Sequence, residues 1–160
     1  AITYAVLYEN SILRVINTRK MLSFNYRGTE DTASSVLVYG WRLIGSEIPV
    51  KGSALMLFAP TAQTDSDFDI RELRLISGAT DRRYSLPDTC IGATVWDKNV
   101  YAVSATMLFR AAMGDNHFTD YKLPLSKPAT RYIGALSNGN VLVACDTEVY
   151  VCTLPQALQR

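Results

Sequence analysis

The chain holds a single histidine, and this limits the chemistry that its side chains could do. His117 stands in the run Gly114-Asp115-Asn116-His117-Phe118, whose residue types are typical of a loop. Metal sites built from several histidines are excluded, and a Ser-His-Asp or Cys-His arrangement would have to use this one residue. Since the sequence shows no nucleophile that belongs with it, we predict that His117 is an exposed loop residue.

Three aspartates at alternate positions form the best candidate for a metal site. Asp65, Asp67 and Asp69 are followed by Glu72, and alternate carboxylates can wrap a hard cation such as calcium. The run lacks the glycine that makes the sharp turn of a calcium loop, and Ile76 stands where the bidentate glutamate would be. We expect a solvated acidic loop between two strands, with calcium as the one cofactor that these residues would suit.

Other catalytic patterns are missing from the sequence. Gly-x-Gly and Gly-Lys-Ser/Thr runs, which cradle phosphate groups, do not occur. A glycosidase needs two carboxylates at a fixed separation, but the acidic residues are scattered and the sequence does not say which of them pair. We therefore expect that the protein is not an enzyme.

Two tryptophans are candidate ligand-binding residues. Trp41 stands in the run Tyr39-Gly40-Trp41-Arg42, and Trp96 adjoins an expected turn at Asp97-Lys98. A ring that stays exposed near the end of a strand could stack on a sugar, because its face is apolar and its edge polar. The alternative for each ring is half-buried packing against a neighbouring sheet.

A basic and aromatic run is the third candidate for ligand binding. Arg82, Arg83 and Tyr84 combine guanidinium groups with a ring, and arginine and tyrosine are common anchors of protein interfaces. We expect these residues to lie in a loop between two strands, where they would suit a polar interface or would simply be exposed.

The charge balance argues against nucleic acid and membrane partners. Sixteen basic residues stand against 15 acidic ones, for a net charge of +1, whereas a nucleic-acid binder usually carries a basic face. Apolar runs such as 54–60 fall far short of the roughly 20 residues that a membrane-spanning helix needs. The N-terminus also lacks the order of charged and apolar residues that marks a signal peptide.

The chain has three cysteines, an odd number with no Cys-x-x-Cys motif: Cys90, Cys145 and Cys152. A hairpin turn at Asp146-Thr147 would place Cys145 opposite Glu148. The same register places Cys152 opposite Val141, so the two sulfurs stay apart. We predict three buried or half-buried free thiols in a reducing compartment, either the cytoplasm or a virion.

Short β-rich runs, separated by two to five turn-forming residues, fill the chain, and helical spacing is nearly absent. Several runs alternate apolar and polar residues, as half-buried strands do. The predicted strands are Ile2–Tyr8, Ile12–Ile16, Met21–Tyr26, Ser35–Leu43, Ala54–Phe58, Ile70–Ile76, Ile91–Trp96, Val100–Ser104, Met107–Ala111, Phe118–Leu125, Tyr132–Leu136, Val141–Ala144 and Glu148–Thr153.

An Ile-Gly pair recurs along the chain. It stands at Ile44-Gly45, Ile91-Gly92 and Ile133-Gly134, with spacings of 47 and 42 residues. Each pair is followed by an expected turn and then by an apolar strand. The expected turns are Lys51-Gly52, Asp97-Lys98 and Asn138-Gly139, and the first 43 residues fit the same pattern with a turn at Glu9-Asn10.

A unit of this length with three or four short antiparallel strands has the size of a propeller blade, and the pattern resembles the β-propeller superfold over most of the chain. The resemblance is one of pattern alone, because Trp96-Asp97 falls at the first turn of its unit, unlike the dipeptide of WD repeats. It implies a single all-β domain, 1–160, formed by a propeller-like array of about four units. These units are 1–43, 44–90, 91–132 and 133–160, and the last is incomplete. A two-sheet β-sandwich or jelly roll and a β-trefoil remain as alternatives.

An incomplete last unit leaves a strand edge that invites pairing. Together with the missing catalytic motifs, this predicts a non-catalytic structural or protein-interaction module. Such a module would act as a subunit of a larger assembly, either a scaffold or a virion coat or tail, through a protein partner or through self-association. The alternative function is a carbohydrate-binding, lectin-like module in which Trp41 or Trp96 stacks on a glycan.

Overall fold

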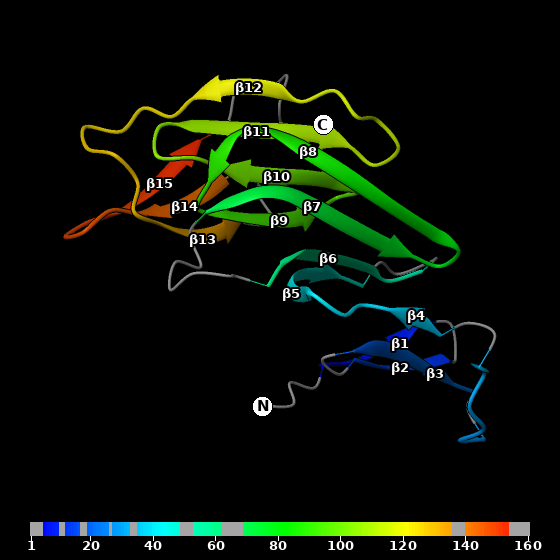
Figure 1. The fold of residues 1–160 in the computed structure, drawn as a ribbon. Helices are drawn as coiled ribbons and strands as arrows, with labels where there is room; N and C mark the ends of the chain where they lie inside the picture. The colour runs from blue at the N-terminus through cyan, green and yellow to red at the C-terminus, as the bar shows by residue number, and fades with distance from the viewer. Residues whose placement is uncertain are drawn as a thin grey trace. The chain divides into compact units, whose positions relative to one another are not determined.

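The computed structural model describes residues 5–9, 12–16, 19–25, 27–32, 35–48, 53–61, 69–135 and 140–153. The secondary-structure elements of this part of the chain are fifteen β-strands, which form four antiparallel sheets (Figure 1). The prediction of an all-β fold with about four antiparallel units of three or four strands is therefore confirmed. The described strands form neither the two large sheets of a sandwich nor a closed barrel.

Each sheet is a meander whose strands pair in chain order. Sheet I contains β1 (Ala5–Glu9), β2 (Ile12–Ile16), β3 (Lys20–Phe24) and β4 (Val36–Leu37). Sheet II contains β5 (Trp41–Glu47), β6 (Leu55–Pro60), β7 (Ile70–Ser77) and β8 (Thr80–Cys90). Sheet III contains β9 (Gly92–Trp96), β10 (Asn99–Val103), β11 (Met107–Ala112) and β12 (Thr119–Lys122). Sheet IV contains β13 (Arg131–Ala135), β14 (Asn140–Ala144) and β15 (Val149–Thr153).

The chain divides into two compact units. Unit 1 is Ala1–Thr61 with Arg74–Arg82, and unit 2 is Ala62–Leu73 with Arg83–Arg160. Sheet II contributes to both units because β7 and β8 cross the division. The expectation of a single domain with repeat units 1–43, 44–90, 91–132 and 133–160 therefore stays a prediction.

Each unit has its own apolar core. In unit 1 the buried cluster joins sheets I and II, and its members are Ile16, Met21, Val38, Met56, Phe58 and Ile76. In unit 2 the cluster joins sheets III and IV, and its members are Tyr101, Val103, Leu108, Leu123, Ala129, Val141, Val143 and Cys152. Within the described residues no helix has the length and apolarity to cross a membrane.

Two strand predictions were wrong. The predicted strand Ser35–Leu43 is divided into β4 and β5 by a turn in which Gly40 has a φ of 84° and Trp41 N donates to Val38 O. Arg82, Arg83 and Tyr84, which we expected to lie in a loop, are part of the long strand β8. Pro87 is tolerated there because β8 is the edge strand of sheet II, where not every backbone N–H needs a partner.

The turn predicted at Asp97-Lys98 is confirmed, whereas Glu9 of the turn expected at Glu9-Asn10 is the last residue of β1 and pairs with Ile12. Asp97 and Lys98 have φ angles of 48° and 58° between the paired residues Trp96 and Asn99, as in a type I′ turn. The turns expected at Lys51-Gly52 and Asn138-Gly139 lie outside the described residues, as does Asn10 of the turn expected at Glu9-Asn10.

The predicted register and burial of the cysteines are also confirmed. Cys152 pairs with Val141, and Cys145 N donates to Glu148 O at 2.9 Å. The two sulfurs of this hairpin are therefore kept apart, as the expected register implied. Cys90, which lies outside the hairpin, and the two hairpin cysteines are all free and buried.

The repeated Ile-Gly pair has a structural basis in two sheets. The register of β5 shifts between Leu43 and Gly45, so that Ile44 is the extra residue of a bulge. The register of β13 shifts in the same way between Tyr132 and Gly134, which makes Ile133 the extra residue. A bulge locally bends a strand and redirects a side chain, so the first strands of sheets II and IV are bent at equivalent places.

Candidate interaction surface

Sheet IV has one buried face and one face that is partly open to solvent. Along β14, Val141 and Val143 are buried, while Leu142 between them and Ala144 after them are only half-buried. Along β15, Cys152 is buried in the core of unit 2. This alternation shows that every second side chain of the strand packs into the core.

The open side of this sheet is apolar. Val149 and Val151 are 62% and 59% exposed, and they pair with Ala144 and Leu142 on the neighbouring strand. Ile133, the extra residue of the β13 bulge, is 49% exposed. We name as the open face of sheet IV the residues Ile133, Leu142, Ala144, Val149 and Val151.

The position of β15 is fixed from its inner side. The Tyr150 hydroxyl donates to the Glu148 carboxylate and lies 2.9 Å from the Ser126 hydroxyl, with which it shares a hydrogen bond. The Glu148 carboxylate raises the pKa of Tyr150 because it accepts a hydrogen bond from the phenolic O–H and so stabilises the protonated form. With Tyr150 and Cys152 held on the inner side, Val149 and Val151 must face outward.

Sheet IV packs on sheet III through their first strands. A Cβ atom at Gly92 would lie 2.6 Å from the Cβ of Tyr132, so β9 can approach β13 this closely only because residue 92 is glycine. The Tyr132 hydroxyl is buried without a partner in the described structure, and burial raises its pKa. The contact leaves the open face of sheet IV on the side away from the unit 2 core.

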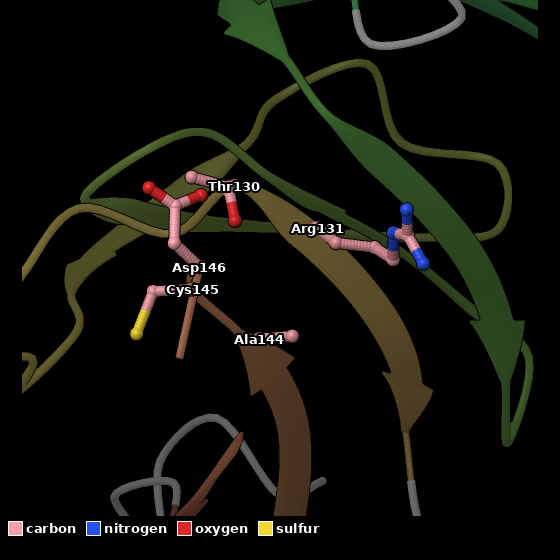
Figure 2. A pocket seen from close by; sticks show the side chains of 5 residues that line it. All are labelled: Thr130, Arg131, Ala144, Cys145 and Asp146. Atoms are coloured by element: carbon pink, nitrogen blue, oxygen red, sulfur yellow. The ribbon is translucent and has the colours of Figure 1, made fainter. Parts of the chain in front are cut away.

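A pocket of about 470 Å³ lies at one end of sheet IV, where β13 begins and β14 ends. Its lining is Thr130, Arg131, Ala144, Cys145 and Asp146. Figure 2 shows the Arg131 guanidinium pointing away from the Asp146 carboxylate and from the Cys145 thiol. The Cys145 thiol donates to Glu148 O at 3.5 Å. These groups do not converge on one point, so the pocket is a polar notch beside the open face.

A second hollow, of about 300 Å³, lies in unit 1. Buried Arg14 is among its lining residues, and the Nη1 atom of Arg14 lies 3.3 Å from Ser23 Oγ on the neighbouring strand. Asp81 also lines the hollow, and its carboxylate is already paired with Arg74. The charges of this hollow therefore serve contacts within unit 1.

Arg74 is a buried charged residue that the sequence patterns did not identify as a candidate site residue. Its Nε and Nη2 atoms donate to the two carboxylate oxygens of Asp81 at 2.8 and 2.6 Å. Its Nη1 atom donates to Leu37 O at 2.8 Å, which links β7 to the edge strand of sheet I. The Asp81 carboxylate raises the pKa of Arg74. This buried guanidinium holds the two sheets of unit 1 together.

The structure places both candidate tryptophans in packed positions. Trp41 is half-buried at the start of β5, and the Arg74 guanidinium lies 5.7 Å from its ring centre. Trp96 is half-buried at the end of β9, with its ring centre 6.3 Å from that of Tyr101. One side of each ring is therefore already in contact with the protein.

The three residues of the basic and aromatic run lie on β8 and not in a loop. Their side chains alternate along the strand, so Arg82 is half-buried, Arg83 is exposed and Tyr84 is only 2% exposed. The Tyr84 ring packs edge-on against Phe118, with ring centres 6.0 Å apart. Since Tyr84 is part of the interior, the run does not present one continuous surface.

The remaining predicted site residues are only partly described. Asp65 and Asp67 lie outside the described residues, whereas Asp69 is exposed and forms an ion pair with Arg71 at 3.1 Å. His117 is exposed in the loop between β11 and β12, as predicted, and its backbone N–H donates to Asp115 Oδ1. Among the described residues no group of three or more His, Cys, Asp and Glu side chains could hold a metal ion.

Comparison with known proteins shows a similar fold but indicates no activity. No family model matches the chain, and no curated protein matches it. A solved structure, described as a protein of unknown function from Bacteroides caccae, is similar over 91% of this chain with a TM-score of 0.50 and 13% sequence identity. This chain spans only 54% of that longer chain. At this level of identity the similarity concerns the fold alone.

Proposed function

We propose that the protein is a non-catalytic interaction module that acts as a subunit of a larger assembly, such as a scaffold or a virion coat or tail. In this proposal the open face of sheet IV is the surface through which it associates. The observation that carries the proposal is the pair Val149 and Val151, which are more than half exposed on an ordered strand whose inner side is fixed by Tyr150 and Cys152.

The exposed apolar side chains of sheet IV lie next to one another. Single exposed apolar side chains are normal, but contiguous apolar patches on a soluble protein usually mark interaction sites. Here Leu142 pairs with Val151 and Ala144 with Val149, so the exposed valines extend an apolar surface across two strands. Fully burying one such side chain contributes about 1.5 kcal/mol, and several together give an interface a useful driving force.

The carbohydrate-binding alternative has less support. Stacking on a sugar needs a free ring face, and the Trp41 ring already has Arg74 over it while Trp96 packs beside Tyr101. The lectin-like function stays a prediction, and binding of the wild-type protein on a glycan array, lost in Trp96→Ala, would support it.

The proposal is tested by placing a charge on the open face. We expect Val151→Asp to shift the sedimentation coefficient of the protein toward that of a monomer, because a buried carboxylate without a partner is costly. Met113→Asp is the matched control, since Met113 is also an exposed apolar residue of unit 2 but lies on the loop after β11. If Val151→Asp and Met113→Asp both sediment like the wild type, the open face is not the interface.

A further inference from the structure

The hollow of about 300 Å³ in unit 1 has a buried side and an exposed side. Arg14 on β2 and Ile76 on β7 are buried, whereas the lining residues Ala79, Thr80 and Asp81 are exposed. All the residues that line the hollow belong to unit 1. The hollow is therefore accessible to solvent beside the turn between β7 and β8, and Arg14 lies on its buried side.

The buried side of the hollow carries a guanidinium group. Arg14 is only 5% exposed, and its Nη1 atom donates to the neutral hydroxyl of Ser23 at 3.3 Å. A guanidinium has several N–H donors in a rigid fork, and this fork matches the oxygens of a carboxylate or a phosphate group. Because Arg14 is shielded from water, its attraction for an anion in the hollow is screened much less than it would be at the surface.

A buried hydroxyl group also lines the hollow. The Oγ atom of Ser35 is buried and has no hydrogen-bond partner among the residues that the structure describes. Buried polar groups in native proteins are nearly always hydrogen-bonded, so an unsatisfied one needs an explanation. An oxygen atom of a ligand in the hollow would accept a hydrogen bond from this hydroxyl. Ser35 is therefore a second group that such a ligand would satisfy.

The lining also includes a carboxylate, that of Asp81, which is neutralised within the protein. Its two oxygens accept hydrogen bonds from Nε and Nη2 of Arg74 at 2.8 and 2.6 Å. Since the paired charges largely cancel, Asp81 opposes an anion much less than a lone carboxylate would. Apart from Arg14 and Asp81, the residues that line the hollow carry no charge. The lining therefore favours a ligand with a negative charge.

We propose that this hollow binds a small oxyanion, the phosphate or carboxylate group of a small molecule, with the Arg14 guanidinium and the Ser35 hydroxyl as its donors. Its volume limits the size of the ligand, because pockets for small molecules begin at about 300 Å³. A hollow at this lower limit suits a compact anion. The inference goes beyond the proposed function, since the hollow lies in unit 1 and the open face of sheet IV lies in unit 2.

Isothermal titration calorimetry of the full chain with sodium phosphate, and separately with sodium acetate, tests this proposal at an ionic strength held constant with sodium chloride. We expect the wild type to bind one oxyanion per chain. Ser35→Ala should weaken binding by about tenfold, because it removes a hydrogen bond to a charged group. Ser46→Ala is the matched control, since Ser46 is an exposed serine of unit 1 that does not line the hollow. Tighter binding of phosphate or of acetate identifies which group the site prefers.

A second pair of variants tests the charge of the ligand. Ala79 is exposed in the turn after β7, so Ala79→Asp adds a carboxylate beside the hollow without changing the core. We expect Ala79→Asp to bind phosphate more weakly than Ala79→Asn, which has nearly the same size but no charge. Circular dichroism checks that every variant keeps the wild-type fold.

Three results would overturn the oxyanion site. They are a wild type that binds neither phosphate nor acetate, a Ser35→Ala protein that binds as tightly as Ser46→Ala, and equal binding by Ala79→Asp and Ala79→Asn. None of these results bears on association through the open face of sheet IV, which sedimentation measures separately.

Discussion

At the residue scale, Arg74 links the two sheets of unit 1 through three hydrogen bonds. Its fork donates to both oxygens of Asp81, and the third nitrogen donates to Leu37 O. The side chain of Arg74 is only 9% exposed, whereas that of Asp81 is 40% exposed, so the ion pair is only partly shielded from water. A lysine keeps the charge but cannot form the planar, forked contact.

We predict that Arg74→Lys lowers the free energy of unfolding by about 2 kcal/mol, measured by urea denaturation. This is less than the loss of a fully buried ion pair, because the Asp81 side chain is 40% exposed and water screens its charge. Arg71→Lys is the control on the same strand. Its ion pair with Asp69 is exposed on both sides, so we expect a change below about 0.5 kcal/mol. Equal losses in the two variants would contradict the role given to Arg74.

The buried thiol of Cys90 leads us to predict that the free energy of unfolding depends on pH. Burial, together with the nearby Asp88, raises the pKa of its thiol from 9.0 to about 12. Between these values the folded protein keeps a proton that the unfolded chain releases. The stabilisation is therefore fully present below about pH 9 and is lost as the pH rises toward about 12.

We expect the free energy of unfolding of the wild type to fall over this pH range more steeply than that of Cys90→Ala. Urea denaturation at several alkaline pH values measures both slopes. The substitution also leaves a small cavity, which lowers stability equally at every pH, so the slope is the informative quantity. Parallel curves for the two proteins would show that the thiol does not titrate as described.

At the scale of elements, the turn between β9 and β10 is built from residues that prefer another conformation. Asp97 and Lys98 both have positive φ, which costs a residue with a Cβ about 1 kcal/mol relative to glycine. The β9–β10 and β10–β11 pairings in sheet III are regular from end to end and hold the turn in place.

We predict that Lys98→Gly raises the free energy of unfolding by about 0.5 kcal/mol, because relief of the backbone strain exceeds the entropy that glycine adds to the unfolded chain. Lys122→Gly, on the exposed side of β12, is the control and should lower it by about 0.5 kcal/mol. Thermal or urea unfolding of both variants measures the signs. A loss of stability in Lys98→Gly would mean that its side chain makes a contact that outweighs the strain.

Strand existence could be predicted from the sequence better than strand boundaries. Alternation identified most strands, and the register of the last hairpin followed from its turn at Asp146-Thr147. β8 was missed because Asp81, Ser85 and Pro87 are turn-forming types, and pairing with β7 overrides this local preference. Gly40 was not recognised as the turn that separates β4 from β5.

The open face of sheet IV could not be predicted from the sequence, because long-range contacts decide which side of β15 faces the core. The sequence of β15 shows that Val149, Val151 and Thr153 share one face and that Tyr150 and Cys152 share the other. Both sets are apolar enough to be the inner one. The choice is made by the hydrogen bond of Tyr150 with Ser126, twenty-four residues away, and by the packing of Cys152 in the unit 2 core. Such long-range contacts leave no local pattern.

Across the whole molecule, the four sheets differ in how far their second strands are buried. The second strands of sheets II and III are buried almost throughout, whereas the second strand of sheet IV alternates buried and half-buried residues beside the exposed Val149 and Val151. Exposed apolar residues that lie side by side on a strand are typical of a surface that a partner covers, and Val149 and Val151 therefore favour association over an isolated subunit.

The central claim is that this chain associates through the open face of sheet IV, and its mass in solution tests that claim most directly. One copy has a mass of 17.7 kDa. Light scattering of the wild-type protein at micromolar concentration should give at least twice this value, and the mass should decrease on dilution. A mass of one copy at every concentration would contradict the account.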